Sequence, residues 1–249
     1  MNKKKILKYW NSRASNKILK CTNDENLEKF ETEFFISKIK KKTYVLDIGC
    51  GEGKLLKNLN NKKKCNCYGL DYSPELIKVA KRKSKNINFF CLDMTKLKKE
   101  FKCNIKFDYI ITKRSIQNLT SWSEQKLFLN QLKYFCKKKT KILLMESSYD
   151  GLNNINKMRT KLNLKKITKP WHNLYLNDMK IKNTKFSGIK LVNIKELFST
   201  YYFTSRVLNA ALTKKPSYND RLNLTGWKLP QNLIKNFSQL KLYEFKVNK

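Results

Sequence analysis

The chain has 249 residues, 41% of them hydrophobic, so it can bury one substantial core but is short for two independent domains. Its first residues lack the apolar run of a secretory signal, and no later segment approaches the roughly 18 consecutive apolar residues of a membrane span. We therefore expect a cytoplasmic protein rather than a secreted or membrane-spanning one.

The formal net charge of +36 would ordinarily indicate a polyanionic partner such as nucleic acid. Only six of the 55 basic residues are arginine, however, and arginine is the side chain that phosphate sites favour. The lysines occur in every segment beside abundant Asn and Ile, a bias that an AT-rich genome would impose on exposed positions. We favour a solvated basic surface, with affinity for an acidic partner as the alternative.

The cysteines and the histidine do not form a metal-binding pattern. Seven cysteines are scattered along the chain without paired CxxC spacing, and His172 is the only histidine. We therefore expect reduced, mostly buried thiols and no metal ion.

The first 40 residues are predicted to form two helices. Residues 4–19 indicate a basic helix with Trp10 and Ile18 among its apolar docking positions. Thr22 and Glu25 fit a capping box that opens a second helix, which ends near residue 40.

From residue 41 to about residue 150, buried strands alternate with amphipathic helices. This alternation predicts an α/β fold in which a mostly parallel sheet carries helices on both faces. The predicted strands span residues 44–48, 67–70, 87–92, 107–112 and 141–145, and the predicted helices span residues 55–59, 74–83 and 124–136.

After Gly151 the regular pattern fades. We expect residues 151–188 to form an irregular, lid-like insertion over the carboxyl edge of the sheet, and residues 189–249 to complete the sheet. No Pro/Gly/Ser-rich linker divides the chain, so residues 1–40, 41–150, 151–188 and 189–249 are expected to be parts of one domain. The later strand-like segments lie near residues 189–194, 198–207 and 241–247.

A glycine-rich loop follows the first predicted strand. Asp47, Gly49, Gly51 and Gly53 form the pattern D-x-G-x-G-x-G, in which glycines let the backbone turn tightly and approach a ligand. A dinucleotide site would instead need G-x-G-x-x-G, and Glu52 would repel a pyrophosphate. The loop therefore favours a cationic or zwitterionic ligand.

Acidic residues end the next two predicted strands. Asp71 follows the glycine loop by about 20 residues, the interval at which an acid reaches ribose hydroxyls. Asp93 ends the third strand and could accept a hydrogen bond from an adenine amino group. The alternative is that both acids only cap the turns that follow them. Because ligands of open α/β sheets lie along the carboxyl edge, we favour ligand binding.

The segments VLDIGCGEG, GLDYSPELI and CLDMTKL resemble the first three motifs of the class I methyltransferases, which use S-adenosylmethionine (SAM) and have a Rossmann-like fold. The resemblance covers roughly residues 20–146 and implies SAM as the cofactor. The loop that receives the methionine part of SAM matches Asp47, Gly49, Cys50, Gly51 and Gly53. The residues that match the ribose site are Asp71 and Tyr72, and those that match the adenine site are Asp93 and Met94.

In that family the segment matching residues 107–119 borders the transferable methyl group. The resemblance thus implies that Lys113 lies beside the cofactor and that Arg114 and Ser115 lie beside the acceptor. The downstream segments ESSYDGLNNINKMR and PWHNLY are similar to methyltransferases that modify sugars and surface polysaccharides, which favours a sugar or glycan hydroxyl as the acceptor.

An alcohol acceptor loses a proton as the new bond forms, and a base with a pKa near neutrality serves this step best. His172 is our candidate base, the alternative being a packing residue between aromatic side chains, and Glu146 is a second candidate base or acceptor ligand. Arg114, Arg159 and Arg206 could bind an anionic group of the acceptor, although structural ion pairs would explain them equally well.

The sequence thus predicts a SAM-dependent methyltransferase acting on a small molecule. One alternative is an RNA methyltransferase, whose bases could stack on aromatic residues such as Trp171, Tyr175, Tyr201 and Tyr202. Another is a non-catalytic SAM-binding or scaffold protein. The oligomeric state is not predicted.

Overall fold

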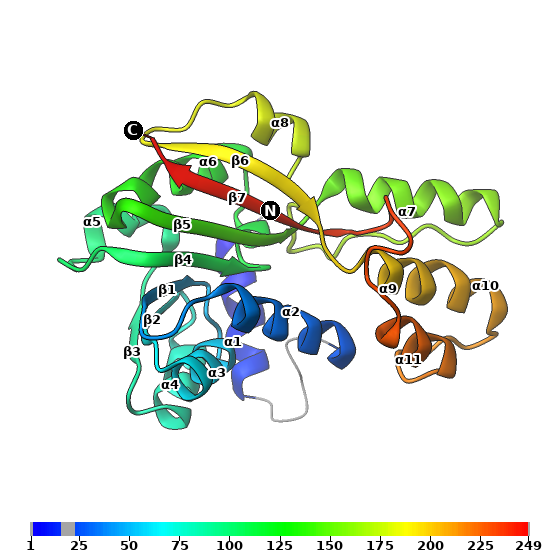
Figure 1. Ribbon diagram of the computed structural model, residues 1–249, viewed down its shortest axis with the longest axis horizontal. Helices are drawn as coiled ribbons and strands as arrows, with labels where there is room; N and C mark the ends of the chain where they lie inside the picture. The colour runs from blue at the N-terminus through cyan, green and yellow to red at the C-terminus, as the bar shows by residue number, and fades with distance from the viewer. Residues whose placement is uncertain (1, 16–22, 249) are drawn as a thin grey trace.

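A computed structural model describes residues 2–15 and 23–248 and contains one seven-stranded sheet of order β3-β2-β1-β4-β5-β7-β6 (Figure 1). Strands β1 to β5 pair in parallel, and β7 lies antiparallel between β5 and β6. The predicted α/β fold with a mostly parallel sheet is confirmed. The strands are β1 (Tyr44–Ile48), β2 (Asn66–Asp71), β3 (Asn88–Cys91), β4 (Phe107–Lys113), β5 (Cys136–Ser147), β6 (Ile189–Glu196) and β7 (Leu240–Val247).

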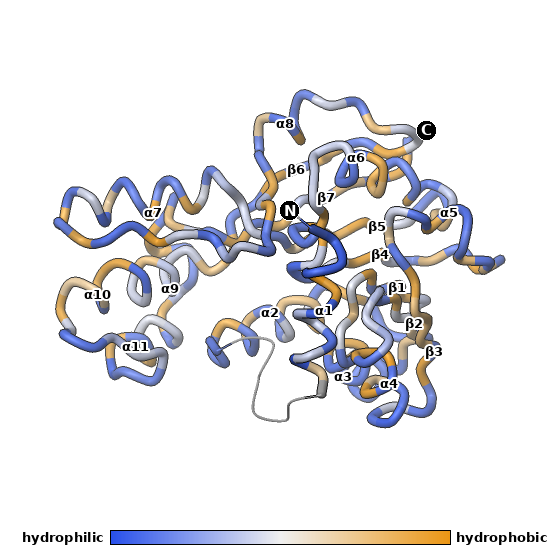
Figure 2. The backbone as a smooth tube through the Cα atoms, turned by 180° about the vertical axis from the view of Figure 1, so that it is seen from behind, coloured by the Kyte–Doolittle hydropathy of each residue, from blue (hydrophilic) through white to orange (hydrophobic). Residues whose placement is uncertain are grey.

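Helices cover both faces of this sheet because successive strand residues point to opposite sides. Val45 packs with α2 (Glu25–Lys38), α3 (Lys54–Lys63) and α4 (Pro74–Lys83). Its neighbour Leu46 packs on the other face, where the helices are α5 (Leu97–Glu100), α6 (Trp122–Gln131) and α8 (Asp178–Asn183). Figure 2 shows the hydrophobic residues gathered along the strands and hydrophilic residues along the outer loops.

The N-terminal helix α1 (Lys3–Ser15) packs against α4, and its Ile6 is buried. Helix α2 begins with Asp24 as its N-cap residue, whose carboxylate accepts a hydrogen bond of 3.0 Å from the Leu27 N–H. Thr22, the predicted cap, and Ile18 lie outside the described residues. The start of α2 is thus set by an aspartate next to its first turn.

Residues 149–161 form a regular helix, α7 (Tyr149–Lys161), where an irregular segment was expected. Ser148 caps α7 because its hydroxyl accepts a hydrogen bond from the Gly151 N–H. This serine is the helix-start signal in a stretch whose polar composition suggested an irregular segment. The structure also contradicts the prediction of a strand at 198–207. That segment forms α9 (Ser199–Phe203) and the π-helix η4 (Thr204–Leu208).

The aromatic and β-branched residues of segment 198–207 suggested a strand, but tertiary packing decides otherwise. Phe198 adopts a left-handed conformation, with φ of 58°, which turns the chain after β6. Thr204 and Ser205 then donate hydroxyl hydrogen bonds to the Tyr201 carbonyl, as Ser and Thr do in helices. Helices α7, α9, α10 (Asn209–Leu212) and α11 (Arg221–Lys228) lie together beyond the carboxyl end of β4 (Figure 1).

Among the described residues, no helix has both the length and the apolar character needed to cross a membrane. Three further short helices connect the larger elements: η1 (Met94–Lys96), η2 (Ile116–Asn118) and η3 (Leu132–Phe135). Of these, η1 and η2 follow β3 and β4 at the carboxyl edge of the sheet, where they support the cavity described below.

Gly151 is required where α7 passes the chain leading into β7. A Cβ at this position would lie 2.1 Å from the Ser238 carbonyl oxygen, a backbone atom that cannot rotate away. We expect Gly151→Ala to lower the free energy of unfolding by about 1–3 kcal/mol, as overpacking does. Lys157→Ala, an exposed position of the same helix, should change it by less than about 0.5 kcal/mol. Equal urea midpoints for the two variants would contradict this packing.

A candidate cofactor and acceptor cavity

A cavity of about 1140 Å³ lies at the carboxyl edge of the sheet. Its walls come from the loops that follow β1, β2, β3 and β4, from helices α1 and α2, and from the segment 167–175. Ligands of open α/β sheets bind at this edge, so the cavity is the candidate functional site.

The glycine loop after β1 is shaped by close contacts with its neighbours. The N–H groups of Gly49 and Cys50 both donate to the Leu70 carbonyl, at 2.7 and 2.9 Å. Gly49 has a φ of 82°, and a Cβ there would lie 2.2 Å from the Ser115 Cβ. Only glycine fits at this position, because both the conformation and the space exclude a side chain.

Asp71 connects the end of β2 to this loop. One carboxylate oxygen accepts from the Gly51 N–H and the other from the Ser73 N–H, both at 2.9 Å. Burial raises the pKa of Asp71, and these hydrogen bonds oppose the rise. The side chain lines the cavity as well as capping the turn, so the two interpretations made from the sequence are compatible.

Asp93 is held by the N-terminal helix. Its Oδ1 accepts from the Thr95 N–H at 2.9 Å, and its Oδ2 lies 2.5 Å from the Lys3 ammonium. Burial raises the pKa of Asp93, but the hydrogen bonds from Lys3 and Thr95 outweigh burial and lower it below its ordinary value. Asp93 and Met94 both line the cavity, so α1 is fixed to the wall at which the resemblance places adenine.

Two buried polar atoms of the cofactor side have no hydrogen-bond partner among the residues that the structure describes: Asp47 Oδ1 and Tyr72 Oη. Both residues line the cavity, as does the Cys50 thiol. Burial raises the pKa of Asp47 to about 7, against the opposing charge of Lys113. Buried polar groups are normally satisfied, so these atoms fit a ligand with an ammonium group and hydroxyls, as SAM has.

The loop after β4 is organised by Glu146, which is fully buried on β5. Its carboxylate accepts hydrogen bonds from the N–H groups of Ser115 and Ile116, at 3.0 and 3.1 Å, and from the Thr112 hydroxyl at 2.7 Å. Among the described residues it is not part of the cavity wall. The oxygens of Glu146 are occupied by the loop that it supports, and its role as a second base or acceptor ligand stays a prediction.

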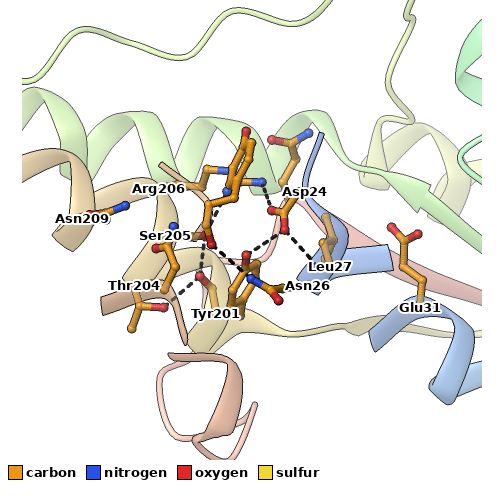
Figure 3. Close-up of polar contacts among 12 residues, drawn as sticks. Asp24, Asn26, Leu27, Glu31, Tyr201, Thr204, Ser205, Arg206 and Asn209 are labelled. Carbon is orange, nitrogen blue, oxygen red and sulfur yellow. Dashed lines mark hydrogen bonds and ion pairs between the residues drawn. The ribbon is translucent and has the colours of Figure 1, made fainter. Parts of the chain in front are cut away.

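Arg114 and Arg206 line the cavity and are paired with buried carboxylates. Arg114 lies 3.0 Å from Glu31, and Arg206 lies 2.7 Å from Asp24, which also accepts from the Tyr201 hydroxyl (Figure 3). Lys113 lines the cavity as well, with its ammonium 3.5 Å from the same Glu31 carboxylate.

Three other predicted site residues serve mainly as structural supports. Arg159 donates to the carbonyls of Lys165 and Arg206 and is absent from the wall formed by the described residues, so its role as an acceptor ligand stays a prediction. Gly53 likewise lies outside that wall, because it turns the chain into α3 and packs against Phe89. Ser115 does line the cavity, but its hydroxyl donates to the Ile48 carbonyl.

His172 lies on the wall formed by segment 167–175 and is only 7% exposed. Its ring stacks on Tyr9 at 4.4 Å and meets the edge of Trp10 at 5.7 Å. Its Nδ1 is buried and has no hydrogen-bond partner within the described part of the chain. Burial and the nearby Arg13 lower the pKa of His172, so the ring is neutral at pH 7.

Several residues of the cavity wall were missed from the sequence, including Gln117, Asn173 and Tyr9. Gln117 lies within the segment 107–119 that was assigned to the methyl group, and this position could have identified it. Asn173 and Tyr9 come from a turn and from the N-terminal helix, where no local pattern distinguishes a site residue from a surface residue.

Deleting the Tyr72 hydroxyl should weaken cofactor binding. We expect Tyr72→Phe to raise the dissociation constant of S-adenosylhomocysteine (SAH) by about three- to tenfold, since the ligand group that pairs with the buried Tyr72 hydroxyl would lose its partner. Tyr243→Phe is the matched control, because the Tyr243 hydroxyl donates to Asp178 at 2.7 Å inside the protein. This control should lose stability and keep its affinity for SAH. Titration calorimetry measures both, and unchanged SAH binding by Tyr72→Phe would remove Tyr72 from the cofactor site.

Comparison with known proteins is consistent with this geometry. Residues 39–218 match the family model described as a methyltransferase domain. An uncharacterized protein of Methanocaldococcus jannaschii is 38% identical over 80 residues, and the match spans 32% of this chain and 27% of that protein.

Two solved structures share the fold at low identity. The N-methyltransferase NodS of Bradyrhizobium japonicum, solved with SAH, has a TM-score of 0.59 and 11% identity, with 98% of this chain and 99% of that chain covered. A chain from the complex of the Haloferax volcanii Trm112 methyltransferase activator with a methyltransferase has a TM-score of 0.60 and 10% identity, with 96% of each chain covered. The chain therefore belongs to the methyltransferase domain family and has the Rossmann-like fold of the class I SAM-dependent methyltransferases.

Proposed function

We propose that the protein transfers the methyl group of SAM to a hydroxyl of a small-molecule acceptor, with a sugar or glycan precursor as the leading class. The observation that carries the proposal is His172, a neutral imidazole on the cavity wall with a buried nitrogen that lacks a partner among the described residues. A neutral imidazole can accept the proton that an alcohol must lose.

When bound, SAM supplies a methyl group on a positively charged sulfur, so the transfer is an in-line displacement. The acceptor oxygen would bond to the methyl carbon, and the electron pair of the broken carbon–sulfur bond would stay on sulfur, giving SAH. His172 takes the hydroxyl proton. The protein's main contributions are then to orient the acceptor and to exclude water.

The residues of this chain can provide that orientation. Asp47, Asp71 and Asp93 line the side of the cavity assigned to SAM, and His172 lies on the wall of segment 167–175. Tyr9 and Trp10 of α1 contact the imidazole ring. Trp10 also donates to Asn118 at 3.1 Å, which ties α1 to the loop after β4 and supports exclusion of water from this side.

The net charge of +36 keeps an RNA methyltransferase as the second candidate. The two candidates, and a non-catalytic SAM-binding protein, are separated by incubating the protein with methyl-labelled SAM and fractionated cell extract. Label in a small soluble or glycan fraction supports the proposal, and label in RNA supports the second candidate. Bound SAM without any transferred label would support the non-catalytic alternative.

Replacing the candidate base should affect turnover rather than cofactor binding. We expect His172→Ala to lower kcat by about 10²- to 10⁴-fold, the usual contribution of general base catalysis. The dissociation constant of SAH should stay within about twofold, because the base contacts the acceptor side. Steady-state kinetics with the acceptor found by labelling measures the effect. Unchanged turnover would remove His172 from the mechanism.

The pH dependence of turnover should report the same group. Protonated His172 cannot accept a proton, so kcat should fall as the pH drops through its pKa. Burial and Arg13 lower that pKa, and the acid limb should therefore have its midpoint below pH 6.5, the ordinary value for histidine. The limb should be lost in His172→Ala. An acid limb that persists in the variant would belong to another group.

A further inference from the structure

Three neutral polar side chains near the loop after β4 remain unexplained by cofactor binding. Within residues 2–15 and 23–248, no hydrogen-bond partner is found for Gln117 Oε1, His172 Nδ1 or Asn173 Oδ1. The three residues are 7%, 7% and 5% exposed, and all of them line the cavity. Buried polar atoms left without partners are costly, so this grouping indicates a ligand that supplies the missing hydrogen bonds.

The two segments that carry these side chains are fixed to each other. The Leu174 N–H donates to the Gln117 carbonyl at 2.6 Å, and the Gln125 amide donates to the Leu174 carbonyl at 2.8 Å. The turn before them is closed by a hydrogen bond of 3.0 Å from the Asn173 N–H to the Pro170 carbonyl. The polar groups are therefore preorganised, as a binding site requires.

Three of the nine basic residues that line the cavity are paired with buried carboxylates and are poorly suited to an anionic acceptor. Arg114 and Lys113 lie 3.0 and 3.5 Å from Glu31, and Arg206 lies 2.7 Å from Asp24. An acceptor phosphate or carboxylate would compete with these buried carboxylates for their cations. An uncharged acceptor leaves the pairs intact.

We propose that Gln117, His172 and Asn173 form a subsite for an uncharged, polyhydroxylated group such as the ring of a neutral sugar. The two amides hydrogen-bond to hydroxyls beside the one that is methylated, since an amide can accept or donate, and His172 takes the proton of the reacting hydroxyl. The inference rests on the proposed function and narrows it by excluding sugar phosphates and uronic acids as the preferred acceptors.

The first test measures binding to the full chain loaded with SAH, independently of methyl transfer. The probes are the methyl α-glycosides of glucose, mannose and galactose, each compared with its 6-phosphate and its uronic acid by titration calorimetry. We expect at least one neutral glycoside to bind about tenfold tighter than its charged counterparts. Hydrogen bonds from the subsite to the sugar hydroxyls can account for a difference of this size. Tighter binding of the charged sugars, or no binding of any neutral glycoside, would overturn the subsite.

The second test removes one of the proposed hydrogen bonds. Gln117→Leu should weaken binding of that glycoside about tenfold while the SAH affinity changes by less than about twofold. Gln131→Leu is the matched control: Gln131 is equally buried, at 7%, but its amide is bonded within the protein to Lys98 and Thr95. The control should lose stability and keep its glycoside affinity. Equal glycoside affinity of Gln117→Leu and the unmodified protein would overturn the inference.

Labelled SAM then separates the subsite from the proposed function. A glycoside that binds at Gln117 but never receives label leaves the subsite standing and contradicts hydroxyl methylation. Transfer of label to a sugar phosphate or a uronic acid in preference to its neutral glycoside supports hydroxyl methylation and contradicts the subsite.

Discussion

Buried carboxylates that accept hydrogen bonds from backbone N–H groups hold the site together. Parallel strands end at one edge, where the loops leave the sheet with N–H groups that need partners. Asp71 accepts from Gly51 and Ser73, and Glu146 accepts from Ser115 and Ile116. The first pair of bonds holds the loop after β1 to the end of β2, and the second holds the loop after β4 to β5. The two loops meet where only glycine fits at position 49. Gly49 and Ser115, one from each loop, both line the cavity.

The distribution of charge differs between the cavity and the chain as a whole. Seven of the nineteen acidic residues line the cavity wall: Asp24, Glu25, Glu28, Asp47, Glu52, Asp71 and Asp93. Nine basic residues also line the wall, so its charge is much closer to balance than the charge of the chain as a whole. A cationic sulfonium cofactor is compatible with this wall, and the net charge alone is weak support for an anionic acceptor.

The parts predicted correctly from the sequence depend on local patterns. The apolar run Tyr44–Ile48 forms the buried strand β1, and Ser73 caps α4 with Pro74 in its first turn. Both features are predictable because strand burial and helix capping depend on residues that are close together in the sequence. Segment 198–207 was predicted incorrectly because packing against α11 and α7 outweighs its β propensity. Glu146 and Arg159 were assigned to the acceptor because their partners lie far away in the sequence, where no local pattern identifies them.

Cofactor binding depends most on the glycine loop and on the carboxylates at the ends of β1, β2 and β3. Titration calorimetry of SAH into the full chain and into Asp71→Asn tests it most directly. We expect saturable binding of one SAH per chain and an affinity at least about tenfold weaker in the variant, since Asp71 both holds Gly51 and lines the cavity. Absence of SAH binding to the folded chain, or equal affinity of the two proteins, would contradict it.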